Sequence, residues 1–410
     1  MNFKNGDIIV VKGPAEIKIK KGLCSIVGAE FKTGDFEIHQ GKSIPVEMRA
    51  DSEVEVNGNF DRLESSTIPE KWHEIAESFA KKKPRVVLVL GEIDTGKTFF
   101  STFLANSLLG KNIKVSIVDC DVGQSDIGPP GTLGLAVLSK PVVFIADEKP
   151  ASLFYLGSHS PGLHLTSAVV GVKKLVDEAL KHSQVVIIDT PGWVQGDGGR
   201  LLRNSEIDIL NPDKIMLLER GRELEHLVKR EPASKIERIR VSKKATSTTD
   251  ADRKLLREKI AEKYYQSLRK LEFSFDNVTT DRAYLLTGER IEPCSVKVLW
   301  AEKLSGWEGI LAATAKPLTG DEIAELKKEF SVFKVKNIVK GVERNMVVGL
   351  LDKDKACLGL GIMEEINYSS REFVLWCPIR EDIKVKIIQF GSIKFSPEMK
   401  EAGFVEPGYF

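Results

Sequence analysis

The hydrophobic residues of this chain follow a different pattern in each of three successive parts. From residue 1 to about residue 66, short apolar or alternating segments are separated by Gly, Asp and Asn, at 8–11, 15–19, 25–27, 36–38 and 52–56. Alternation with a period of two between turn-forming residues is typical of antiparallel strands, and Asn57-Gly58 is a turn signal. The pattern predicts a small N-terminal β domain over residues 1–66.

The middle part contains uniformly apolar runs at 86–90, 115–119, 142–145, 185–189 and 215–218. Helical periodicity separates these runs, for example over 165–182, and Trp72, Ile75 and Phe79 mark an amphipathic helix over 69–83. Apolar strands that alternate with helices are typical of a parallel sheet covered on both faces. We therefore predict an α/β core over 67–280.

After residue 280 the helical periodicity fades. Apolar segments at 296–300, 346–351 and 385–390 are separated by polar and turn-forming residues. They predict a β-rich C-terminal domain over 281–410, to which the sequence assigns no function.

Composition narrows the class of protein. The net charge of +1 over 410 residues gives no global sign of a nucleic-acid partner, but the segment 219–270 holds 16 Lys or Arg and 9 Asp or Glu. The five cysteines are scattered without a C-x-x-C pair, which argues against a disulfide framework and a zinc site. Because no apolar run reaches the roughly 18 residues of a membrane span, we expect a cytoplasmic protein without a membrane partner.

The first apolar run of the middle part is followed by a phosphate-binding loop. The pattern G-x-x-x-x-G-K-[ST] is matched by Gly91, Glu92, Ile93, Asp94, Thr95, Gly96, Lys97 and Thr98. In such a loop successive NH groups face the β-phosphate, the lysine reaches the β- and γ-oxygens, and the final hydroxyl is a magnesium ligand. With a strand before it and a helix after it, the motif predicts a P-loop that binds ATP and Mg²⁺, with Thr98 on the metal.

Two further strand ends carry candidate residues. Asp119 and Asp121 follow the second apolar run, at the edge where this fold binds ligands. Asp121 is the candidate magnesium-linked carboxylate and proton acceptor, and Asp119 is the second candidate. Capping of a helix or turn is the alternative role for each aspartate, and it competes more strongly for Asp119 than for Asp121.

The fourth apolar run ends in Asp189-Thr190-Pro191-Gly192-Trp193. The first four residues suit the γ-phosphate sensor of a GTPase, but Trp193 offers a flat face on which a nucleobase stacks, worth roughly 1–3 kcal/mol. Burial against the neighbouring helix is the alternative role for this ring. The guanine-reading Asn-Lys-x-Asp motif is absent after the fifth run, which disfavours a GTPase.

The basic segment contains Arg253 and Arg257, four residues apart and therefore on one face of a predicted helix. Such a pair offsets the charge of a migrating phosphoryl group, as an arginine finger does. Ordinary surface arginines have the same spacing, and Arg238 or Arg240 is an alternative for this role.

Taken in order, these motifs resemble those of the polynucleotide 5′-hydroxyl kinase family, and the chain is similar to an archaeal-type member. That family includes the kinase of eukaryotic pre-mRNA cleavage and tRNA splicing and the kinase of ribosomal RNA processing. The resemblance spans roughly residues 1–300 and rests on the P-loop, Asp121-Val122-Gly123-Gln124 with Pro130-Gly131-Thr132 behind it, Thr190-Pro191-Gly192-Trp193 and the arginine pair.

The resemblance implies an ATP-dependent kinase that phosphorylates the 5′-hydroxyl of RNA or DNA. It implies catalytic roles for Lys97, Asp121, Arg253 and Arg257, the last two in a mobile lid over about 220–270. It implies substrate binding by Gln124, Thr190, Gly192 and Trp193, and metal binding by Thr98 and Asp121. The segment 158–162 is a further candidate for substrate contacts.

Three rival functions remain open at this point: a non-catalytic ATP-bound scaffold of an RNA-processing complex, a nucleotide-switch GTPase and a small-molecule kinase. The sequence does not distinguish RNA from DNA, or single from double strands, because stacking and phosphate contacts do not depend on the sugar. It names no protein partner, oligomeric state or pathway.

Overall fold

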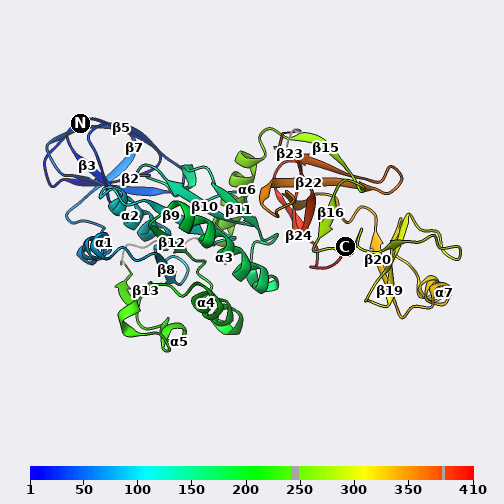
Figure 1. The fold of residues 1–410 in the computed structure, drawn as a ribbon. Coiled ribbons are helices and arrows are strands. Elements are labelled where there is room, and N and C mark those ends of the chain that lie inside the picture. Colours follow the sequence, from blue (N-terminus) through cyan, green and yellow to red (C-terminus); the bar gives the residue numbers. More distant parts are fainter. Residues whose placement is uncertain (242–248, 381–383) are drawn as a thin grey trace. The chain divides into compact units, whose positions relative to one another are not determined.

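The computed structural model describes residues 1–241, 249–380 and 384–410 (Figure 1). The chain divides into two compact units, each considered by itself below. The first contains Met1–Asp121, Gly134–Ala151 and Val169–Thr249, and the second contains Val122–Leu133, Ser152–Ala168 and Asp250–Phe410.

The N-terminal part of the first unit is an antiparallel sheet in the order β1-β7-β2-β6-β3-β4, with β5 also paired to β2. Its strands are β1 (Asn2–Phe3), β2 (Ile8–Lys21), β3 (Cys24–Ile26), β4 (Ala29–Phe31), β5 (Gly34–Ile38), β6 (Ser43–Met48) and β7 (Ser52–Leu63). The predicted turn at Asn57-Gly58 is wrong, because both residues lie inside β7. Gly58 faces an irregularity of β2, and a Cβ there would lie 2.5 Å from the Cβ of Ala15. This glycine therefore permits a close approach of strands.

The rest of the first unit is an α/β sheet with the strand order β10-β9-β12-β8-β13-β14. Pairing is parallel throughout except between β10 and β9. The strands are β8 (Val86–Gly91), β9 (Val115–Asp119), β10 (Thr132–Leu138), β12 (Val185–Asp189), β13 (Lys214–Glu219) and β14 (Ile236–Arg240). The helices of this region are α1 (Glu70–Lys82), α2 (Lys97–Leu109), α3 (Leu165–His182, whose first turn belongs to the second unit), α4 (Gly196–Leu210) and α5 (Glu225–Val228), with short 3₁₀ turns at η1 (Ile145–Asp147) and η3 (Ala233–Lys235). The 3₁₀ turn η2 (Pro161–Leu163) belongs to the second unit. The P-loop α/β fold is confirmed, with a mixed sheet in place of the wholly parallel one.

One predicted strand of this sheet does not form. Residues 142–145 are irregular and lead into η1, and the strand that pairs with β9 on this side is β10 instead. The Asn106 side chain explains the difference, because its amide nitrogen donates to the Val142 carbonyl at 2.7 Å and its oxygen accepts from the Val142 NH at 2.9 Å. The backbone of Val142 is thus satisfied without a strand neighbour.

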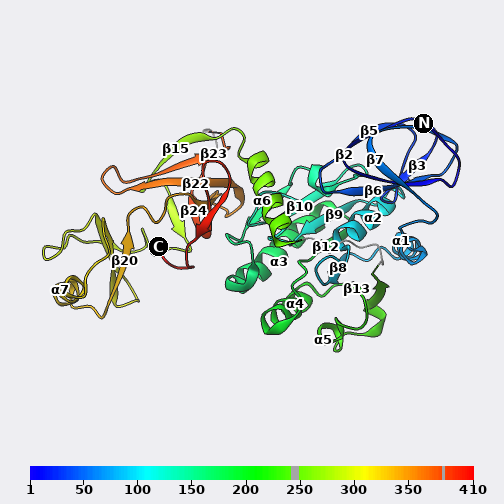
Figure 2. The same cartoon turned by 180° about the vertical axis from the view of Figure 1, so that it is seen from behind.

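The second unit contains two sheets and a short strand, β11 (Ser152–Tyr155). The larger sheet has the order β15-β23-β22-β21-β24-β16, with β25 paired to β24, and the smaller has the order β17-β18-β19-β20. Figure 2 labels β15, β22, β23 and β24 of the larger sheet and β20 of the smaller one. The elements are α6 (Asp250–Tyr264), β15 (Arg269–Ser274), β16 (Thr279–Asp281), β17 (Glu289–Arg290), β18 (Trp300–Leu304), β19 (Gly309–Thr314), α7 (Gly320–Phe330), β20 (Lys334–Val339), β21 (Met346–Leu351), β22 (Cys357–Asn367), β23 (Glu372–Cys377), β24 (Ile387–Phe395) and β25 (Glu401–Phe404).

Tyr155 of β11 anchors its segment to the larger sheet of the second unit. Its side chain is buried, and its hydroxyl donates to the Val347 carbonyl at 2.6 Å. A Cβ on Gly349 or Gly391 would come within 2.7 and 2.0 Å of Tyr155, so both glycines make room for the ring. Among the helices in the described part of the chain, none is long and apolar enough to cross a membrane.

Candidate functional site

The P-loop connects β8 to the buried helix α2. Gly96 is the N-cap of α2 with a φ of 83°, and Asp94 has a φ of 58°. The first turn of α2 holds no acidic residue, and no side chain caps its N-terminus within the described residues. The free NH groups and the positive end of the helix dipole therefore suit an anion such as a phosphate.

Lys97 begins α2 and is only 8% exposed. Its Nζ donates to the Glu92 carbonyl at 2.7 Å, and the Thr95 hydroxyl donates to the same oxygen at 2.9 Å. Burial lowers the pKa of Lys97 below its ordinary value, and the carboxylates of Asp189 and Asp121 oppose that shift. The loop thus holds a desolvated cation close to two acidic groups, which strengthens its attraction for the oxygens of a triphosphate.

Three carboxylates lie at the ends of the neighbouring strands β9 and β12, of which β12 also pairs with β8. Asp119 and Asp189 are 5% and 4% exposed and lie opposite each other in the parallel pairing, whereas Asp121 is half-buried. The Asp119 carboxylate accepts the Asp121 NH at 2.9 Å, which holds the turn after β9. Asp119 therefore has a local structural task, and Asp121 is the more accessible acid.

The donors present fit a magnesium ion. The Thr98 hydroxyl and the Asp121 carboxylate are hard oxygen ligands, and Mg²⁺ commonly takes one or two protein ligands together with phosphates and water. In the described ranges no three His, Cys, Asp or Glu side chains gather as a metal cage.

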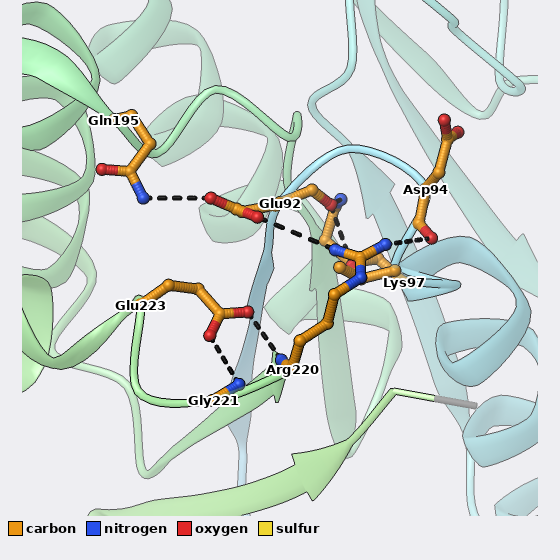
Figure 3. A network of polar contacts seen from close by, with 8 residues as sticks. Glu92, Asp94, Lys97, Gln195, Arg220, Gly221 and Glu223 are labelled. Atoms are coloured by element: carbon orange, nitrogen blue, oxygen red, sulfur yellow. Dashed lines mark hydrogen bonds and ion pairs between the residues drawn. The ribbon is translucent and has the colours of Figure 1, made fainter. Parts of the chain in front are cut away.

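Arg220 is a P-loop contact that the sequence did not identify. Its Nη2 donates to the Asp94 carbonyl at 3.3 Å, and its Nη1 lies 3.7 Å from the Glu92 carboxylate, which also accepts from Gln195 at 3.0 Å (Figure 3). Glu223 fixes the turn by accepting the Arg220 NH at 2.6 Å. The sequence places Arg220 just after the apolar run 215–218. The structure adds that this strand, β13, pairs with β8 and so brings Arg220 to the P-loop.

A buried ion pair on α4 was likewise not predicted. Arg203 and Glu206 are 0% and 1% exposed, and their side chains lie 2.6 Å apart. Burial raises the pKa of Glu206 to about 7, and the Arg203 charge opposes that rise. Arg203 also acts on Lys97 and lowers its pKa, after burial as the main cause. Helix α4 therefore contributes to the electrostatics of the P-loop from inside the protein.

The segment after β12 contacts strand β8 through Thr190 and the first turn of α4 through Trp193. The Thr190 hydroxyl is buried and donates to the Val89 carbonyl of β8 at 2.7 Å, so its predicted role in substrate binding would have to be indirect. Trp193 is half-buried, and its ring packs on the backbone of Gly198 in the first turn of α4. Stacking of a base on this ring stays a prediction.

Gly192 lies against the P-loop itself, which leads to a prediction. A Cβ at this position would lie 2.5 Å from both the backbone nitrogen and Cγ1 of Ile93. We expect Gly192→Ala to displace the loop and to raise the Kd for ATP about tenfold, since a charge-assisted NH to phosphate bond is worth roughly 1.5–3 kcal/mol. Calorimetric titration measures the change.

Gly110→Ala is the matched control for this substitution. Gly110 ends α2 with a φ of −59°, and the nearest atoms to its added Cβ lie at 3.5 Å. Its ATP affinity should equal that of the parent. Unchanged affinity in Gly192→Ala would contradict the assignment of Gly192 as a support of the loop.

The remaining predicted residues belong to the second unit. Gln124 is half-buried in the turn after Asp121, and Arg253 and Arg257 are half-buried on α6. Of the alternatives, Arg238 lies on β14 of the first unit and forms ion pairs with Glu219 and Glu225. Arg257 is also ion-paired, with Glu401, so the choice between Arg238 and the α6 arginines as lid residues stays a prediction. Residues 242–248 of the predicted lid lie outside the described residues.

The chain is similar to several known proteins. Residues 91–267 match the family model described as "mRNA cleavage and polyadenylation factor CLP1 P-loop". The chain is 32% identical to the polyribonucleotide 5′-hydroxyl-kinase of Pyrococcus abyssi, over 79% of this chain and 92% of that protein. It is 30% identical to the protein of the same name from Methanocaldococcus jannaschii, over 79% of this chain and 91% of that one.

More distant likenesses cover a part of the chain or its fold alone. The human polynucleotide 5′-hydroxyl-kinase NOL9 is 33% identical over 32% of this chain and 19% of its own length. Clp1p in its solved complex with Pcf11p matches with a TM-score of 0.64 at 13% identity, over 96% of this chain and 97% of that chain. The fold of this chain is thus that of Clp1p over nearly the full length.

Proposed function

Because the chain belongs to the polyribonucleotide 5′-hydroxyl-kinase family, we propose that it transfers the γ-phosphoryl group of ATP to the 5′-hydroxyl end of a polynucleotide. The names of the archaeal relatives support RNA as the substrate. The observation that carries the proposal is the buried Lys97, bonded to the P-loop carbonyl of Glu92 with the acidic groups Asp121 and Asp189 close by. This arrangement suits a phosphoryl group under transfer.

In the proposed reaction the 5′-oxygen of the polynucleotide forms a bond to the γ-phosphorus, and the bond from that phosphorus to the bridging oxygen of ADP breaks. The hydroxyl proton passes to a carboxylate at the strand ends, for which Asp121 is the candidate. Lys97 and the NH groups of the loop hold the transferred charge, as positioning and electrostatics dominate this chemistry. Magnesium on Thr98 and Asp121 would neutralise phosphate oxygens. Arg253 and Arg257 of α6 are proposed to offset further charge.

Transfer of labelled γ-phosphate to matched 5′-hydroxyl RNA and DNA oligonucleotides tests the proposal. We expect transfer from ATP to RNA, with the label at the 5′ end. ATP binding without transfer to either oligonucleotide would leave a non-catalytic scaffold, and hydrolysis of GTP without an oligonucleotide would indicate a nucleotide switch.

The Trp193 ring is proposed to stack on the terminal base, and its packing on Gly198 provides a test. Trp193→Ala should raise the KM for the oligonucleotide about 10- to 100-fold, because stacking is worth roughly 1–3 kcal/mol per base. A Cβ on Gly198 would lie 2.7 Å from two ring atoms of Trp193, closer than van der Waals contact. Gly198→Ala should therefore shift the ring and raise the same KM less strongly.

Gly320→Ala is the control for the added methyl group, because a Cβ at Gly320 would meet no atom within 4 Å. It should behave as the parent protein. Steady-state kinetics with the oligonucleotide varied at saturating ATP provide the measurement. An oligonucleotide KM that stays at the parent value in Trp193→Ala would assign this ring to packing alone.

A further inference from the structure

Arg257 of α6 is held from two directions within the second unit. Its Nη1 donates to the Gly123 carbonyl at 3.2 Å, and its Nε donates to the carboxylate of Glu401. Gly123 directly precedes Gln124 in the D-V-G-Q string, whereas Glu401 begins β25, near the end of the chain. A residue of the C-terminal region, to which the sequence assigned no function, therefore contacts one of the two arginines proposed to act in phosphoryl transfer.

The contact between Arg257 and Glu401 is sheltered from water. The side chains are 16% and 21% exposed, so their attraction is screened less than that of a surface pair. A charge-assisted bond of this kind also restricts a long side chain that would otherwise sample many rotamers. Together with the bond to Gly123, it fixes the plane of the guanidinium group.

The surroundings of Glu401 leave its charge for Arg257. His159 Nε2 lies 3.7 Å from the Glu401 carboxylate, but burial lowers the pKa of His159 to about 4, so this ring is neutral at neutral pH. The His159 ring is packed edge-on against Phe395, with centroids 5.9 Å apart. His159 thus limits the position of the carboxylate without competing for its charge.

Lys400, which directly precedes β25, makes a separate connection to α6. Lys400 Nζ lies 3.3 Å from the Glu258 carboxylate and 3.0 Å from that of Glu262, and the Glu401 NH donates to Glu258 at 3.3 Å. Two contacts of different kinds therefore join the same two elements: one uses Arg257, and the other does not. They can be removed one at a time.

We propose that Glu401 is a positioning residue for phosphoryl transfer, which orients the guanidinium group of Arg257 from the C-terminal region. This inference rests on the proposed kinase function. The role is indirect, because Glu401 acts through Arg257 and touches no reacting atom. Since small errors in the placement of a catalytic group reduce rates strongly, loss of this contact should lower turnover more than substrate affinity.

The test is a double-mutant cycle with Glu401→Gln and Arg257→Ala, in which oligonucleotide phosphorylation is measured. Glu401→Gln keeps the size of the side chain and removes its charge. We expect kcat to fall about tenfold, with the KM for ATP within twofold of the parent. In the Arg257→Ala background the same substitution should have no further effect, because the group that it orients is gone. Glu401→Asp should recover part of the lost rate.

Lys400→Met is the matched control, since it removes the ion pairs to Glu258 and Glu262 and leaves the contact with Arg257 in place. It should keep the parent kcat. An equal loss of kcat in Lys400→Met, or an equal effect of Glu401→Gln with and without Arg257, would overturn the inference and reduce Glu401 to a packing residue. A faster Glu401→Gln enzyme would also overturn it, because Glu401 would then restrain Arg257.

The NMR signal of the Arg257 Nε–H group, assigned with Arg257→Lys, separates this inference from the proposed function. We expect the signal to be protected from exchange in the parent protein and to exchange faster in Glu401→Gln, because a neutral amide oxygen accepts more weakly from a guanidinium group than a carboxylate does. Absence of transfer by the parent would overturn the kinase proposal and the kinetic role together. Active parent protein with an unchanged Nε–H signal in Glu401→Gln would overturn the positioning role alone.

Discussion

Lys97→Met is expected to abolish phosphoryl transfer without destabilising the protein. The ammonium group is the cation that the P-loop brings to the phosphates, and loss of such a preorganised charge costs about 10³-fold in rate, or roughly 4 kcal/mol. Burial makes the charged form of Lys97 less favourable in the folded protein than in the unfolded chain. The methionine removes that cost and fills the same space, so Tm should stay equal or rise.

Lys111→Ala is the control for Lys97→Met. Lys111 follows the other end of α2, is 38% exposed and forms a surface ion pair with Glu77, which contributes little to stability. Its rate and Tm should match the parent. Comparison of γ-phosphate transfer with thermal unfolding distinguishes the two effects in each variant. If Lys97→Met kept a tenth of the parent rate, residues other than Lys97 would stabilise the charge on the transferred phosphoryl group.

The sequence was most informative where structure depends on local pattern. The P-loop, the strand before it and helix α2 lie where the motif predicted them, and four of the five apolar runs are strands of the α/β sheet. A short apolar run that alternates with helical periodicity is consistent with a buried strand of a parallel sheet. The remaining run, at 142–145, does not form a strand, because the Asn106 side chain from α2 makes the hydrogen bonds of the Val142 backbone. Such a contact depends on tertiary structure that periodicity does not describe.

The contacts that the sequence did not predict at the site also depend on tertiary structure. Arg220 follows β13, yet only the strand order of the sheet, with β13 next to β8, brings it to Glu92 and Asp94 of the P-loop. The pairing of Arg257 with Glu401 joins residues 144 positions apart. A lone arginine or glutamate has no local signature, because surface charges occur throughout any soluble chain. Long-range placement of single charges was therefore beyond sequence reasoning.

The second substitution with a large expected effect on kcat is at Asp121, one of the three carboxylates at the ends of β9 and β12. We expect Asp121→Asn to lower kcat at least 100-fold and to raise the Mg²⁺ concentration needed for half-maximal rate, because a neutral amide is a poor substitute for a carboxylate on a hard cation. Asp119→Asn removes a charge from the same turn but keeps an oxygen that can accept the Asp121 NH. It should therefore retain the parent requirement for Mg²⁺.

Titration of Mg²⁺ at saturating ATP, with Asp189→Asn as a third variant, separates metal binding from general electrostatics. Asp189 and Asp121 both act on Lys97, so a purely electrostatic role would give the two variants similar rate losses and no change in metal requirement. A ligand role instead predicts that only the half-buried Asp121 shifts the Mg²⁺ dependence. A shift in Asp119→Asn or Asp189→Asn, with Asp121→Asn at the parent value, would make one of the two buried acids the metal ligand. Asp121 would then act only as the proton acceptor or as part of the turn after β9.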